Sequence, residues 1–153
     1  MFKKIVIVSL GLLCAYSAFG EVSEKTVQGK VTIKNNVVFL GGKEVVPKIK
    51  GGEVAVEGSD ALSIEENLKY KNGNAILIMD FSRGVSCPAK YRWLIVTPDS
   101  TTQTPEFGSC SDLPKVSVAG DKLTVMFPRY NSAPKSTVVF DGVNLAENGK
   151  PVK

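Results

Sequence analysis

The sequence predicts an all-β fold, a single antiparallel β-sandwich or flattened barrel of about seven to nine strands with at most one short helix. Short apolar segments alternate with Gly, Asn, Asp and Pro turn residues roughly every eight to twelve positions, a spacing typical of sandwiches and barrels. Within several segments apolar and polar side chains alternate, which indicates a strand with one buried and one solvated face.

The first half of the chain is predicted to hold three strands before an ambiguous segment. These strands span residues 27–34, 37–40 and 43–49. Pro47 favours an edge strand or a bulge, because proline cannot donate to a ladder. Residues 59–68 fit two structures: Ser59 and Asp60 suit the cap of a short helix, whereas the alternation over 62–66 suits a strand. Both alternatives stay open.

In the second half, residues 75–79 are continuously apolar, which predicts a central strand covered on both faces. The preceding Asn72-Gly73 pair is typical of a two-residue hairpin turn. Residues 147–149 begin either a polar tail or a final short hairpin. Further strands are predicted at residues 91–96, 102–108, 115–118, 122–127 and 137–140.

The N-terminal segment has the features of a secretory signal peptide. Lys3 and Lys4 precede an apolar run over residues 5–18, and the small residues around Gly20 suit cleavage before Glu21. We therefore expect residues 1–20 to be removed, leaving a single β domain over 21–153 that is periplasmic or secreted. The apolar run is short for a membrane span, so no stable membrane anchor is expected in the mature chain.

Composition excludes several functions. The chain has no histidine, which excludes Ser-His and Cys-His nucleophilic pairs and histidine-ligated metals. Two of its 19 basic residues and none of its 15 acidic residues lie in the predicted signal peptide, so the remaining chain carries +2. This charge gives no electrostatic argument for a nucleic-acid partner or an anionic membrane. No motif for a metal or cofactor is present, so none is expected.

The cysteines predict one disulfide. Cys14 lies in the predicted signal peptide, which leaves Cys87 and Cys110 to pair in an oxidising compartment. The two enclose 22 residues, and the midpoint falls between Pro98 and Asp99. The strong turn expected there would place the cysteines together at the base of a hairpin.

This hairpin is the candidate binding element. Its segment from Pro98 to Glu106 would form a recognition loop. The alternative, which is the more usual role of a disulfide in exported domains, is that the bridge only protects an exposed hairpin from fraying and proteolysis. Trp93 suits core packing beside a disulfide, with exposure in a ligand groove as the alternative. The candidate partner-binding residues are Tyr91, Trp93, Pro98, Asp99, Glu106 and Phe107.

The first functional hypothesis is an exported bacterial binding protein, of the inhibitor or immunity type, that blocks a partner enzyme or toxin. The second is a structural or assembly accessory, such as an adhesin-like domain. A hydrolase with a carboxylate pair ranks third, because acids at turns are ordinary and no catalytic constellation is evident. No catalytic residue is therefore assigned.

Overall fold

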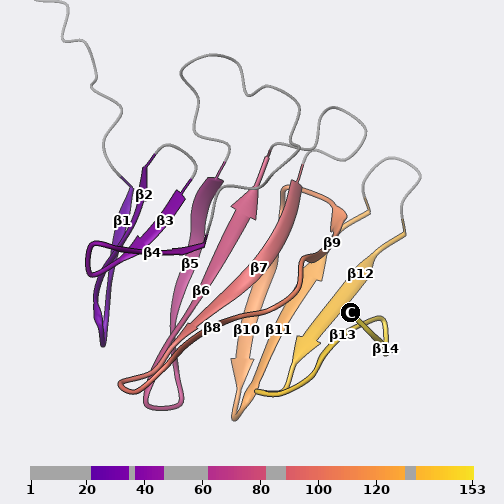
Figure 1. Cartoon of the computed structure of the whole chain (residues 1–153). Coiled ribbons are helices and arrows are strands. Elements are labelled where there is room, and N and C mark those ends of the chain that lie inside the picture. The colour runs from indigo at the N-terminus through magenta and orange to yellow at the C-terminus, as the bar shows by residue number, and fades with distance from the viewer. Residues whose placement is uncertain (1–21, 35–36, 47–61, 82–88, 130–133) are drawn as a thin grey trace, which may run out of the picture.

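The structure is a computed structural model that describes residues 22–34, 37–46, 62–81, 89–129 and 134–153. All regular elements in these ranges are strands, and every pair is antiparallel (Figure 1). The predicted all-β antiparallel fold is confirmed. The described residues form 14 strands in three sheets, more than the seven to nine predicted. The excess comes partly from short strands of two or three residues, which are too short to show periodicity.

The first sheet has the order β1-β2-β3-β4. Val31 and Ile33 are buried, as the alternation predicts, whereas Val27 lies exposed in the β1–β2 turn. Pro47 and the segment that follows lie outside the described residues. The strands are β1 (Ser23–Thr26), β2 (Gly29–Lys34), β3 (Val37–Leu40) and β4 (Lys43–Val46).

The middle sheet has the order β5-β6-β7-β8, and β9 also pairs with β7. The ambiguous segment is a strand from Leu62 onward. A bulge at Glu65 reverses its alternation, so that Ile64 packs against one side of the sheet and Leu68 against the other. The strands are β5 (Leu62–Tyr70), β6 (Gly73–Asp80), β7 (Ala89–Val96), β8 (Thr101–Gln103) and β9 (Phe107–Cys110).

The β5–β6 turn is one residue earlier than predicted. Tyr70 pairs with Gly73, so the turn residues are Lys71 and Asn72, and Lys71 takes the positive φ of 51°. Gly73 is already a strand residue. A Cβ there would lie 2.0 Å from the carbonyl oxygen of Val96, so the close approach of β7 requires glycine.

The third sheet has the order β10-β11-β12-β13-β14. The predicted hairpin over 115–127 is confirmed, with Val116 opposite Val125. Residues 147–149 lie in a final hairpin rather than a polar tail. The strands are β10 (Lys115–Ala119), β11 (Lys122–Phe127), β12 (Ser136–Phe140), β13 (Leu145–Glu147) and β14 (Lys150–Pro151).

The middle sheet packs against the other two sheets on opposite faces, which explains its continuously apolar β6. Leu77 and Met79 join a core with the third sheet, whereas Ile76 and Ile78 join a core with the first sheet. The prediction that β6 is central and covered on both faces is confirmed. The described part of the chain contains no helix of the length and apolar character needed to span a membrane.

Polar side chains fasten the β1–β2 turn to the middle sheet. Gln28 Nε2 donates to the carbonyl oxygens of Thr97 and Ser100, and Thr101 Oγ1 donates to Gln28 Oε1 at 3.3 Å. The backbone N–H of Val27 donates to Asn74 Oδ1 at 3.0 Å. These bonds join residues about 47 to 73 positions apart in sequence and fix the first sheet at one end of the middle sheet.

Candidate binding cleft

Strand β8 leaves one edge of the middle sheet open. The N–H of Thr97 donates to the carbonyl of Ser100, and the N–H of Thr104 donates to the carbonyl of Trp93. In an antiparallel ladder hydrogen-bonded positions alternate, so residues 100, 102 and 104 direct their backbone groups toward β7. Thr101 and Gln103 therefore direct their N–H and C=O groups away from β7, and no other described strand pairs with them.

A cleft of about 520 Å³ lies beside this edge, between β8 and the β13–β14 hairpin. Its volume is within the range of small-molecule and peptide sites. Ile95, Phe140 and Leu145 supply buried apolar surface, and Val143 at the rim is 84% exposed. The remaining lining residues come from the β8 side and the C-terminal hairpin: Thr102, Gln103, Thr104, Pro105, Gly142, Asn144, Ala146, Gly149, Pro151 and Val152.

Both walls of the cleft are held by hydrogen bonds. In the turn between β12 and β13, Asp141 Oδ1 accepts from the N–H groups of Val143 and Asn144 at 2.9 and 2.7 Å. These backbone hydrogen bonds, that of Asn144 first, lower the pKa of Asp141. On the other wall, Thr104 Oγ1 accepts from the N–H of Trp93 at 3.0 Å. Hydrogen bonds therefore fix the backbone on both walls of the cleft.

Three of the predicted binding residues are core residues instead. Tyr91, Trp93 and Phe107 are at most 2% exposed, so they offer no surface to a partner. The ring of Tyr91 lies 4.9 Å from that of Phe127, and its hydroxyl donates to the carbonyl of Ser111 at 2.8 Å. Burial raises the pKa of Tyr91 well above its ordinary value of 10.0. Core packing, the first of the two alternatives for Trp93, is what the structure shows.

The other three lie on the surface. Pro98 and Asp99 are exposed at the tip of the β7–β8 turn, and Glu106 forms an ion pair with Arg92 at 2.6 Å. None of these three lines the cleft, although their neighbours from Thr102 to Pro105 do. The opposite wall was missed from the sequence because β12 and β13 are distant in the chain from β8. The one sequence signal for this wall was the final hairpin expected at residues 147–149.

Two predictions, the disulfide and the signal-peptide cleavage, involve residues outside the described ranges. Cys110 ends β9 opposite Ala89, with a positive φ of 67°. Cys87 lies outside the described residues, so the disulfide stays a prediction, as does cleavage between Gly20 and Glu21.

Within the described ranges no group of three or more His, Cys, Asp or Glu residues is arranged to hold a metal ion. Comparison with known proteins finds no matching family model, curated protein or solved structure.

Proposed function

We propose that this chain is an exported binding protein that takes an extended segment of a partner protein into the cleft beside β8. The observation that carries the proposal is the pair of outward backbone positions, Thr101 and Gln103, at the margin of a cleft with an apolar floor. An added strand would gain main-chain hydrogen bonds from this edge. Its alternate side chains would enter the cleft and give specificity.

Blocking a partner enzyme or toxin would follow if the segment that the cleft takes is one the partner needs for activity. Export would place the protein in an oxidising compartment, where the Cys87–Cys110 disulfide would brace the sheet that carries β8. In this proposal the tip at Pro98 and Asp99 contacts the partner beyond the cleft, because both residues are exposed next to β8.

The test combines a peptide selected from a displayed random-peptide library with amide hydrogen exchange of the protein. In the free protein the N–H groups of Thr101 and Gln103 should exchange quickly, whereas those of Thr102 and Thr104 should be protected by the ladder. Bound peptide should slow exchange at Thr101 and Gln103. If selected peptides bind without protecting these two amides, the proposed binding mode is wrong.

Gln103→Pro removes one outward N–H without removing a backbone hydrogen bond to β7, although it removes the side-chain bond from Arg92 to Gln103 Oε1. Proline is tolerated at such edge positions, so the fold should remain, while affinity for the peptide should fall about tenfold, equivalent to one net hydrogen bond of about 1.4 kcal/mol. Gln103→Ala is the matched control, because it removes the same side chain and keeps the N–H. Equal loss in both variants would contradict strand addition.

The alternative of an assembly accessory uses the same edge. If β8 pairs with β8 of a second copy, Thr101 and Gln103 should become protected at high protein concentration without peptide. Gln103→Pro should then abolish self-association. Protection that depends on peptide but not on protein concentration favours the binding protein.

A further inference from the structure

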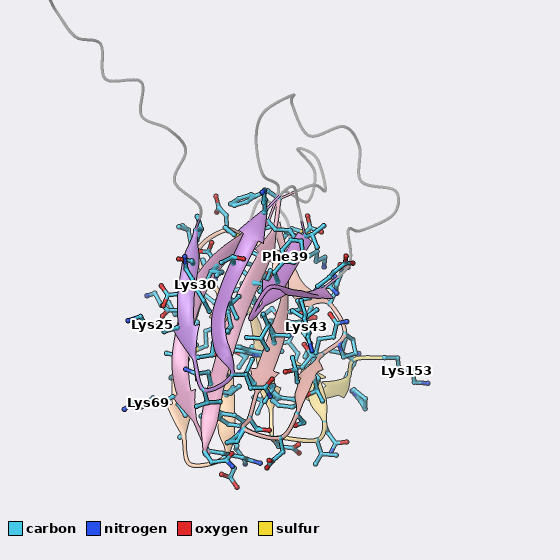
Figure 2. The ribbon with its side chains drawn as sticks, turned by 60° about the vertical axis from the view of Figure 1, so that its left-hand side comes forward. Lys25, Lys30, Phe39, Lys43, Lys69 and Lys153 are labelled. Carbon is cyan, nitrogen blue, oxygen red and sulfur yellow. The ribbon has the colours of Figure 1, made fainter. Side chains whose placement is uncertain are left out.

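The outer face of the first sheet collects lysines that are scattered in the sequence. On β2 the buried side chains of Val31 and Ile33 point toward the middle sheet, so Lys30, Thr32 and Lys34 point outward. Lys25 on β1 lies directly opposite Lys30. We name the surface formed by Lys25, Lys30, Thr32, Lys34 and Phe39 the basic face. Figure 2 labels Lys25, Lys30 and Phe39 on it.

The pairing of Lys25 with Lys30 is unfavourable by itself. Directly opposed side chains in an antiparallel pair lie about 5 Å apart at Cβ, where like charges repel. Of the acids that the structure describes, one, Glu44, lies on the same side of the sheet as the basic face. It lies on β4 opposite Phe39, at the other edge of the sheet from Lys25. Among the described residues no carboxylate lies within ion-pair distance of the three lysines. A negatively charged ligand would relieve this repulsion.

The middle of the basic face is amphipathic. Phe39 on β3 lies opposite Thr32 and is half-buried, so part of its ring remains accessible beside a hydroxyl group. Lys30 and Lys34 each lie two residues from Thr32 along β2, a separation of about 7 Å. Accessible ring, hydroxyl and flanking ammonium groups together match a sugar ring that carries acidic substituents.

Other anionic surfaces fit less well. Membrane binding requires apolar side chains that enter the acyl boundary, whereas Phe39 and the adjoining Val37, which lies opposite Lys34, are both half-buried. Single-stranded nucleic acids bind on several stacking aromatics, and arginine suits phosphate geometry. The described residues of this face offer one aromatic ring and no arginine.

We propose that the basic face binds an anionic polysaccharide, through ion pairing at Lys25, Lys30 and Lys34 and ring contact at Phe39. This site is separate from the cleft: it lies on the first sheet, whereas the cleft lies between the middle and third sheets. Ion pairing at exposed lysines weakens as salt increases, so the interaction should be strongest at low ionic strength.

The test measures binding of the purified protein to heparin by calorimetry at low and physiological salt. The variant Lys25→Gln/Lys30→Gln should bind heparin at least tenfold more weakly. The control Lys115→Gln/Lys122→Gln removes the same charge from exposed positions on the third sheet and should change affinity less than twofold. The midpoint temperature of thermal unfolding of the first variant should be unchanged or higher, because a repulsive pair is lost.

Three outcomes would overturn the proposal. Equal loss in both double variants would show that net charge, not the basic face, governs binding. Tighter binding to phosphatidylglycerol vesicles or to single-stranded DNA than to heparin would assign the face to a different partner class. Absence of heparin binding at low salt would remove the site altogether. None of these outcomes bears on the cleft, which the peptide experiment tests separately.

Discussion

Replacing Gln28 with alanine should loosen the first sheet from the middle sheet. One side chain makes three hydrogen bonds there, as donor to the carbonyls of Thr97 and Ser100 and as acceptor from Thr101. A typical hydrogen bond contributes about 0.5–1.5 kcal/mol net, which gives about 3 kcal/mol for three. Because these groups are only partly buried, water replaces some of that, and we expect a loss of about 2 kcal/mol.

Urea unfolding of the variant, followed by fluorescence of the sole tryptophan, measures this loss. Trp93 is fully buried between the middle and third sheets, so its signal reports the core rather than the Gln28 contacts themselves. The midpoint should fall while the slope of the transition stays the same. Gln28→Glu should cost at least as much, because a carboxylate cannot donate to the two carbonyls. A change below about 0.5 kcal/mol in both variants would refute the reasoning, since that is the range of ordinary surface substitutions.

Three further predictions follow from single residues. Gly73→Ala should lower the free energy of unfolding by about 3 kcal/mol, measured in urea, because its Cβ would overlap the carbonyl oxygen of Val96. The folded pKa of Tyr91 is raised, so its stabilising contribution is complete below pH 10.0 and is lost as pH rises further; Tyr91→Phe should remove this alkaline dependence of the urea midpoint. The folded pKa of Asp141 is lowered, so its contribution is present above pH 3.8 and lost as pH falls through the folded pKa. The amide NMR signal of Asn144 should therefore titrate with a midpoint below 3.8.

Strands whose burial follows a simple apolar periodicity could be predicted from the sequence. The apolar run at 75–79 identified a strand with two covered faces, and the alternation at Val31 and Ile33 identified a half-buried strand. The division into three sheets was not predictable in this way, because an apolar side chain does not reveal which neighbouring sheet it faces. Gly73 shows the same difficulty, since its requirement arises from the distant Val96 and not from turn geometry.

The candidate sites were harder to predict than the fold. Thr102 and Phe140 line one cleft only because the middle and third sheets pack together. Lys25 and Lys30 become neighbours through strand register, which a count of net charge cannot detect. The aromatic residues near the predicted loop were attractive candidates, yet the same apolar character that made them conspicuous places them in the core.

Among the described strands, each one pairs with a strand next to it along the chain except β9, which pairs with β7 instead of β8. Such meandering connectivity pairs strands that are close in sequence, so hairpins should assemble early and at small entropic cost. The later, slower event should be the stacking of three preformed layers. A chain with this order of assembly can begin to fold from its N-terminal end before the last hairpin has emerged from the ribosome.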